Sequence, residues 1–160
     1  MPVYLRETIA GWLDALEVLQ EERGAGGSPL DRARGLERQA RANSAFPADP
    51  RGIVHYMAAS ALLHRYLDAG PRPTAEAAEA YYLLGVAESH IASSRWYPET
   101  DFFLETAIRL DPAATLARRA YRYLDEYVKA GYTGSSGEHV PPEVQAWLAE
   151  LKSLVDRGSQ

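Results

Sequence analysis

The sequence predicts an all-α protein of about seven helices, stacked as antiparallel helix-turn-helix hairpins. Apolar residues recur at steps of three and four along most of the chain, which is the period of an amphipathic helix. β-branched residues nowhere alternate with polar ones over more than a few positions, so we expect no strand. Most connections are short, which favours antiparallel neighbours. With 160 residues, the chain fits one domain, residues 1–160.

The first helix carries a single apolar stripe and ends at the glycine-rich connector GAGGS. The stripe consists of Leu5, Ile9, Trp12, Leu16 and Leu19. A second helix begins at Ser28 and Pro29 and reaches about Asn43. Ser28 can cap the helix, and Pro29 suits its first turn.

The third helix begins in the same way at Asp49 and Pro50 and ends at Gly70. It is apolar nearly all round, so we expect it to be the most buried helix. Thr74 caps the fourth helix, which runs to about Ala92. The fifth helix begins at Pro98 and ends at Pro112.

The sixth helix covers about residues 114–129 and stops at Gly131. The loop GYTGSSGEHVPP follows; it lacks the G-K-[ST] of a phosphate loop and no strand precedes it, so we expect a flexible connector. The last helix begins at about Pro142. Its amphipathic pattern is typical of a helix that caps the end of a repeat stack.

Residues 79–112 resemble a tetratricopeptide repeat, a helical hairpin of 34 residues. Tyr81, Leu84 and Gly85 match the first helix of that motif, and Leu104, Ala107 and Pro112 match the second. Gly85 lets the two helices cross closely, because any side chain there would hold them apart. The hairpin departs from the motif by a three-residue insertion between Gly85 and Ala107, and by Glu88 where an aromatic residue is usual. Residues 29–71 and 115–156 resemble degenerate repeats.

The resemblance implies a TPR-like right-handed superhelix whose concave groove binds a protein or peptide. Mapped onto this sequence, the groove face of the 79–112 repeat holds Glu79, Tyr82, Val86, Ser89 and His90. Family members that clamp a peptide carboxylate use Lys, Asn and Arg there, and this repeat has Tyr82 and Val86 instead. Tyr81 and Tyr82 point about 100° apart, so one is core and the other presented. The alternative for Tyr82 is packing against the neighbouring helix.

A second candidate surface lies on the sixth helix, where Arg119, Tyr123 and Tyr127 follow one another at steps of one turn. Arg118 and Arg122 share an adjacent face. Such a surface could hold an acidic peptide through arginine–carboxylate pairs. The alternative is a solvated helix face on which the arginines pair with Asp125 and Glu126.

Composition excludes several classes of protein. The formal net charge of −5 argues against nucleic-acid binding, and the arginine series Arg34, Arg38 and Arg41 has no interleaved aromatics. Without cysteine there is no disulfide, cysteine nucleophile or thiolate metal site. No apolar run is long enough to span a membrane. We expect a soluble piece of a longer protein, either cytoplasmic or, if a leader or anchor was removed, periplasmic.

Catalytic and metal-binding motifs are not evident, so we expect no enzyme, no cofactor and no metal. The histidines His55, His64, His90 and His139 show no ligand spacing, and a metal site would need His90 to meet another histidine across helices. Asp101 and Glu105 lie one turn apart and are expected to face solvent rather than to act as an acid–base pair.

Three hypotheses for function follow. The first is a non-catalytic protein- or peptide-binding module, scaffold or assembly factor, whose partner and oligomeric state are unknown. The second is a scaffold that self-associates through an exposed edge, such as the first helix with Trp12. The third is a metal or small-molecule binder that uses His90, His64 and nearby carboxylates.

In the turn of the 79–112 hairpin, Trp96 and Tyr97 are expected to plug the hairpin end.

Overall fold

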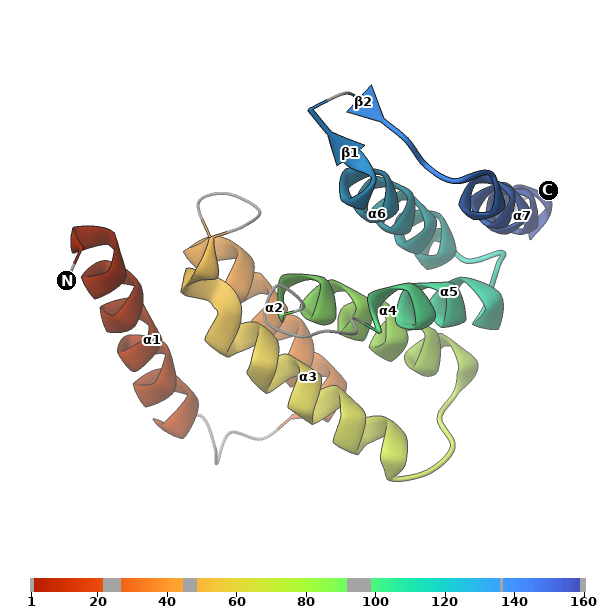
Figure 1. The fold of residues 1–160 in the computed structure, drawn as a ribbon. Helices are drawn as coiled ribbons and strands as arrows, with labels where there is room; N and C mark the ends of the chain where they lie inside the picture. Colours follow the sequence, from red (N-terminus) through yellow and green to blue (C-terminus); the bar gives the residue numbers. More distant parts are fainter. Residues whose placement is uncertain (1, 22–26, 45–48, 92–98, 136, 159–160) are drawn as a thin grey trace. The chain divides into compact units, whose positions relative to one another are not determined.

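The computed structural model describes residues 2–21, 27–44, 49–91, 99–135 and 137–158, and confirms the all-α class. Over these residues the chain forms seven α-helices, each close to its predicted place (Figure 1). They are α1 (Val3–Glu21), α2 (Pro29–Asn43), α3 (Ile53–Asp68), α4 (Thr74–Ile91), α5 (Thr100–Leu110), α6 (Thr115–Gly131) and α7 (Pro142–Gly158).

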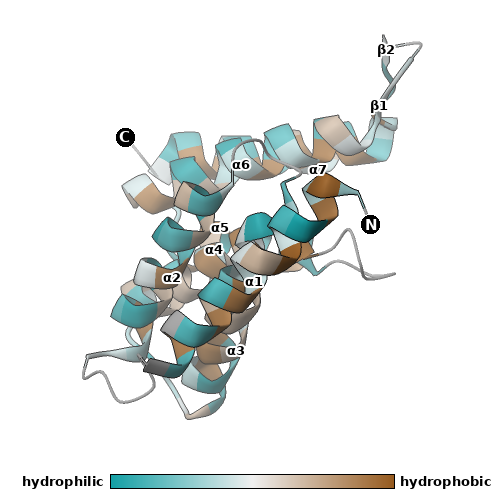
Figure 2. Cartoon of the chain, turned by 90° about the vertical axis from the view of Figure 1, so that its left-hand side faces the viewer, coloured by the Kyte–Doolittle hydropathy of each residue, from teal (hydrophilic) through white to brown (hydrophobic). Residues whose placement is uncertain are grey.

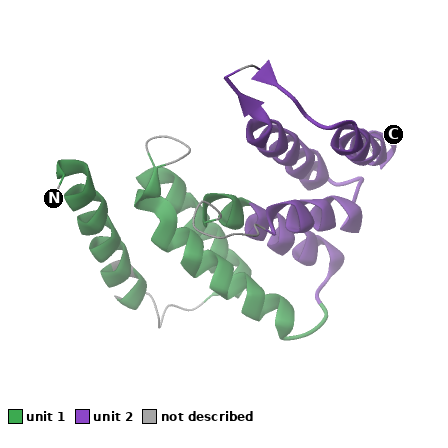
Figure 3. Cartoon of the chain, viewed as in Figure 1, with its two compact units in different colours: residues 1–71, 86–98 green, residues 72–85, 99–160 purple. Residues whose placement is uncertain are grey.

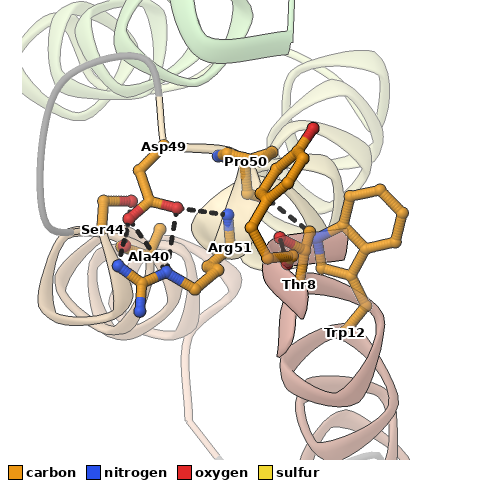
Figure 4. A network of polar contacts seen from close by, with 8 residues as sticks. Thr8, Trp12, Ala40, Ser44, Asp49, Pro50 and Arg51 are labelled. Atoms are coloured by element: carbon orange, nitrogen blue, oxygen red, sulfur yellow. Dashed lines mark hydrogen bonds and ion pairs between the residues drawn. The ribbon is translucent and has the colours of Figure 1, made fainter. Parts of the chain in front are cut away.

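The starts of the second and third helices follow from their capping residues. Ser28 caps α2, and its side chain accepts a hydrogen bond from the Asp31 N–H at 3.2 Å. The predicted third helix begins instead as a 3₁₀ turn, η2 (Pro50–Gly52), before α3 starts. The Asp49 carboxylate accepts the Arg51 N–H at 3.1 Å and binds the Arg51 guanidinium, with Nε at 2.9 and 3.0 Å from its two oxygens (Figure 4).

Glycine is required at position 52, where η2 lies against α2. A Cβ atom there would lie 2.5 Å from the carbonyl oxygen of Ala40, closer than real Cβ contacts come. Ser44 lies in the same place, and its hydroxyl donates to the same Ala40 oxygen at 2.9 Å (Figure 4). Close backbone approach therefore fixes where the 3₁₀ turn meets α2.

The 131–141 connection contains two strands of two residues each, which the sequence did not predict. β1 (Thr133–Gly134) pairs antiparallel with β2 (Gly137–Glu138). Gly137 has a φ of +112°, a conformation that side chains disfavour, so glycine permits the turn. Strands this short show no alternation of polar and apolar residues, which is why the pattern missed them.

The helices divide into two compact units, coloured separately in Figure 3. Unit 1 comprises residues 1–71 and 86–98, and unit 2 comprises residues 72–85 and 99–160. The boundary falls inside α4, between Gly85 and Val86. The single domain 1–160, its degenerate repeats 29–71 and 115–156, and the superhelix stay predictions.

In unit 1, α1 packs on η2 and α3 through the small residues Thr8 and Ala15 and through Trp12, so only part of its predicted stripe makes this contact. Thr8 and Ala15 are buried, and the Trp12 indole N–H donates to the carbonyl oxygen of Pro50 at 2.8 Å (Figure 4). Ile9 and Leu16, both members of the predicted stripe, are exposed. The buried face is turned toward Thr8 and Ala15 because these small side chains allow a close approach.

The most buried helix is α4, and the expectation that it would be the third helix is wrong. Every residue from Tyr82 to Glu88 is buried, whereas Met57 on α3 is 52% exposed. Within unit 1, α4 meets α3 through Glu88, whose carboxylate accepts the Ser60 hydroxyl at 2.8 Å. The family motif has an aromatic residue at position 88. Here a buried hydrogen bond to Ser60 accounts for the glutamate.

In unit 2, Gly85 gives α4 and α5 the close crossing expected from the sequence. A Cβ atom on Gly85 would lie 2.5 Å from Cγ and 2.7 Å from Cδ2 of Leu104. Leu104 itself is fully buried, as is Leu84. α5 packs against both α6 and α7, and α6 also packs against α7. The hairpin therefore carries the steric feature that the tetratricopeptide resemblance implies at Gly85.

Candidate functional site

An open pocket of about 780 Å³ lies in unit 2, where residues of α5, α6 and α7 come together. Its lining combines three aromatic side chains, one carboxylate and four small or apolar residues. The lining residues are Asp101, Tyr127, Val128, Ala130, Gly131, Tyr132, Val144 and Trp147. A concave, mainly apolar site with few polar groups is the usual form of a binding pocket.

Local sequence places each aromatic residue at the pocket. Tyr127 and Gly131 lie one turn apart on α6, so they share a face. Tyr132 follows the last residue of α6, and its N–H donates to the carbonyl oxygens of Val128 at 3.2 Å and Lys129 at 3.1 Å. Tyr132 thus stands at the helix end, where it is 40% exposed.

Trp147 is held in place by a chain of polar contacts that links α5 with its own helix, α7. Its indole N–H donates to Glu105 Oε2 at 3.0 Å. The other Glu105 oxygen accepts from Arg109 Nε at 2.6 Å, and Arg109 also reaches Glu150 at 2.8 Å. These hydrogen bonds to Glu150 and Glu105 raise the pKa of Arg109. Glu105 is thereby committed to positioning the indole ring.

Asp101 supplies the one carboxylate of the pocket and lies in the first turn of α5. Partial burial raises the pKa of its carboxyl above the ordinary value, and the nearby Glu105 raises it further. As a residue Asp101 is exposed, as the sequence predicted, whereas Glu105 is half-buried. Glu105 binds Arg109 and Trp147, whereas Asp101 faces the pocket.

Two of the groove residues predicted from the sequence, Tyr82 and Arg119, meet each other in unit 2. Tyr82 is only 6% exposed, and the Arg119 guanidinium lies 5.1 Å from its ring centroid, in cation–π contact. Tyr82 therefore packs against a neighbouring helix, which is the alternative considered from the sequence. Glu79 and Tyr123 are half-buried, and Arg119 is exposed.

The other predicted groove residues of α4 belong to unit 1 and are largely turned inward. Val86 has no exposed surface, so it offers nothing to a partner in this conformation. The Ser89 hydroxyl donates to the Val86 carbonyl oxygen at 2.7 Å. His90 stacks on Tyr56 with ring centroids 4.2 Å apart. A peptide-binding face on this half of α4 is thus not apparent from the burial of its residues.

Several of the arginines noted in the sequence contact neighbours on their own helix. Arg118 donates to the Thr115 hydroxyl at 3.2 Å. Asp125, expected to pair with an arginine, instead binds Lys129 at 2.8 Å. On α2, Arg41 binds Glu37 at 2.6 Å, in agreement with a solvated helix face.

Three further features considered from the sequence are a metal site, a membrane span and the turn of the 79–112 hairpin. In the described part of the chain, no group of three or more His, Asp or Glu side chains is placed to hold a metal ion. Nor does any described helix combine the length and hydropathy needed to cross a membrane. The turn with Trp96 and Tyr97 lies outside the described residues, so the predicted plug stays a prediction.

Comparison with known proteins finds no match: no protein-family model, no curated protein and no solved structure is similar to the chain. The protein is therefore described by its own fold and site. It is an all-α protein with a helical hairpin and an aromatic-lined pocket. Of the predicted site residues, only Tyr127 lines this pocket. Tyr132 and Trp147 were missed, although an aromatic residue just after the helix stop at Gly131 was a usable signal.

Proposed function

We propose that the chain is a non-catalytic module that binds a protein or peptide, acting as a scaffold or assembly factor of the tetratricopeptide-like kind. The observation that carries this proposal is the open pocket formed by α5, α6 and α7, with aromatic side chains on α7 and at the end of α6. Aromatic residues in pockets dominate the binding energy of many protein interfaces.

The mechanism is display of rigid aromatic side chains. The hydrogen bond from Trp147 to Glu105 orders the indole ring before a partner arrives. A side chain that is already ordered loses little conformational entropy on binding, so more of the contact energy appears as affinity. The proposal keeps the predicted surface of α6, with Arg119, Tyr123 and Tyr127, and adds Tyr132 and Trp147.

A binding role suits the pocket better than catalysis. Acid–base chemistry by paired carboxylates needs two such groups in different protonation states at the reacting atoms. Asp101 is the carboxylate that lines the pocket, and the neighbouring Glu105 binds Arg109 and Trp147. The remaining lining consists of apolar groups, backbone and tyrosine.

A photo-crosslinking experiment tests the proposal. A photoreactive phenylalanine analogue would replace Tyr132 in the pocket or, as a control, Phe102, which is exposed on α5 but does not line the pocket. We expect a protein that crosslinks at position 132 and not at 102. That protein, once purified, should bind the chain about tenfold more weakly after Tyr127→Ala and equally well after Phe102→Ala. If the partner binds the Tyr127→Ala variant with unchanged affinity, the proposed site is wrong.

A second candidate function, self-association, is favoured by an apolar surface on α1. Leu13 and Leu16, which lie on one side of α1 at a step of three residues, are 57% and 45% exposed, and in Figure 2 apolar residues lie among hydrophilic ones on the face of α1 turned to the viewer. Leu16 and the exposed Met57 also line a second pocket, of about 500 Å³, in unit 1. Large exposed apolar patches often mark interaction surfaces.

This surface differs from the one expected from the sequence, because Trp12 is turned toward Pro50. Sedimentation over a hundredfold concentration range would test self-association. We expect a concentration-dependent dimer that Leu13→Lys abolishes. Asp14→Asn, an equal charge change at an exposed position about 100° around the same helix, should leave the dimer intact. A monomer at every concentration would exclude self-association and would leave the proposed binding function untested by this experiment.

A further inference from the structure

We propose that the unit 2 pocket binds a basic side chain of the partner, an arginine or lysine, with its cation between the Asp101 carboxylate and the aromatic rings of Tyr127, Tyr132 and Trp147. The inference rests on the proposed function and names the ligand that the same pocket takes. It draws on the lining of the pocket and on the charges around it.

The aromatic lining is the first argument. Tyrosine and tryptophan rings carry negative potential on their faces and attract ammonium and guanidinium groups. Three such side chains line one pocket together with a carboxylate. The chain already shows this chemistry elsewhere in unit 2, where the Arg119 guanidinium lies over the Tyr82 ring. A cation is thus the ligand group that can use the rings and the carboxylate at once.

The charge of the site is the second argument. Asp101 lies one turn from Glu105 on α5, and this like charge, together with burial, works against ionisation of the Asp101 carboxyl. A cation placed in the pocket would offset both effects, whereas an anion would add to them. The nearby lysine, Lys129, follows the lining residue Val128 on α6. Its charge is already paired with Asp125, at 2.8 Å.

The dimensions of the pocket favour a side chain carried on a peptide over a free ion. A volume of about 780 Å³ falls in the range of pockets that take drug-sized ligands. It therefore has room for the apolar stem of an arginine or lysine and for neighbouring residues of the partner. The small residues Ala130 and Gly131 leave this space open next to Tyr132.

A titration followed by nuclear magnetic resonance tests the inference on the full chain. The probe is a blocked pentapeptide with arginine between two glycines on each side. Its twin carries citrulline, which keeps the shape of arginine but has no charge. We expect the arginine peptide to shift the Trp147 indole N–H and the backbone amides of residues 127–132 in a saturable manner. The citrulline peptide should bind about tenfold more weakly, as expected for the loss of a desolvated cation–π and carboxylate contact.

A matched pair of variants isolates the role of Asp101. Asp101→Asn should reduce the affinity for the arginine peptide about tenfold and leave that for the citrulline peptide unchanged. Asp156→Asn removes an equal charge from an exposed position on α7, outside the pocket, and should change neither affinity. The amide spectrum of each variant shows directly whether the fold is kept.

The outcomes separate this inference from the proposed function. Two results would overturn the inference that the ligand is a cation: equal affinity for both peptides, or an Asp101→Asn variant that binds the arginine peptide normally. Either result would still allow the pocket to be a docking site. Shifts confined to residues away from the pocket, or no binding of either peptide at 10 mM, roughly the weakest affinity such a titration detects, would also overturn the inference. The crosslinking experiment then decides the proposed function by itself.

Discussion

Replacing Gly85 by alanine isolates the close contact on which the α4–α5 hairpin depends. The new Cβ atom would lie 2.5 Å from Cγ of Leu104, a side chain that is fully buried, so one of the two residues would have to shift. Overpacking of this kind typically costs about 1–3 kcal/mol. Alanine, however, favours a helix over glycine by about 0.5–1 kcal/mol. Subtracting this gain from the cost, we expect Gly85→Ala to lower the free energy of unfolding by about 0–2.5 kcal/mol.

Gly35 on α2 and Gly11 on α1 provide matched controls. Both lie within helices, and nothing lies within 4 Å of a Cβ atom added at either position. Gly35→Ala and Gly11→Ala should therefore stabilise the protein by about 0.5–1 kcal/mol through helix propensity alone. Because the propensity gain is shared, the difference between Gly85→Ala and Gly35→Ala measures the steric cost by itself, about 1–3 kcal/mol.

Urea unfolding followed by circular dichroism at the helix band measures these differences. With a slope of about 2 kcal/mol per molar urea, the midpoints of Gly85→Ala and Gly35→Ala should differ by about 0.5–1.5 M. In a Leu104→Ala background the clashing Cγ and Cδ2 atoms are gone, so Gly85→Ala should become stabilising there. If Gly85→Ala stabilises the parent chain as much as Gly35→Ala does, the steric argument is wrong.

Three further predictions concern single polar groups. Ser60→Ala removes a donor from the buried Glu88 carboxylate and should cost about 1–3 kcal/mol in urea unfolding. Trp12→Phe keeps an aromatic ring, although a smaller one, but loses the indole N–H and its hydrogen bond to the Pro50 carbonyl; the lost hydrogen bond should cost about 0.5–1.5 kcal/mol by the same assay. Asp101→Asn should stabilise the protein at pH 7, because the raised pKa of Asp101 means that folding disfavours its charged form. That gain should shrink as the pH falls through the raised pKa of the folded protein and should be lost below about 3.9, where the unfolded aspartate is also protonated.

Each of these predictions has a distinct contrary result. Ser153→Ala, at an exposed position on α7, is the control for Ser60→Ala, and equal small effects would mean that the buried hydrogen bond adds nothing. For Trp12→Phe, an unchanged urea midpoint would mean that the indole hydrogen bond to Pro50 adds no stability over a bond to water. For Asp101→Asn, a loss of stability at pH 7 would show that the carboxylate has a stabilising partner. A gain in stability combined with loss of the arginine peptide would be the usual behaviour of a binding residue.

Helix positions were predictable because local signals agree with the fold. Ser28, Pro29 and Gly131 mark helix ends through capping and backbone geometry that act within a few residues. The close approach at Gly85 was also predictable, since a glycine at this point of the first helix is typical of a known helical hairpin, even though three residues are inserted before its second helix. These features depend on neighbours in sequence or on one recurrent pattern.

The site was less predictable because it depends on which faces of the helices are covered. The pattern put Tyr82 and Val86 on a presented face, yet burial of the middle of α4 on all sides leaves little of either exposed. The pocket, in turn, brings Asp101 and Trp147 together from α5 and α7, and no short motif links them. The orientation of Trp147 follows from its bond to Glu105, a contact between residues far apart in sequence.

Helix α4 belongs to both units, and this has a consequence for any attempt to divide the protein. The chain passes from one unit to the other three times, after residues 71, 85 and 98. A fragment that stopped at Pro71 would lack Glu88 and His90, the α4 partners of Ser60 and Tyr56. During synthesis, the first half of α4 must likewise wait for α5 before Gly85 meets Leu104. No single cut in the chain therefore leaves both units with all of their residues.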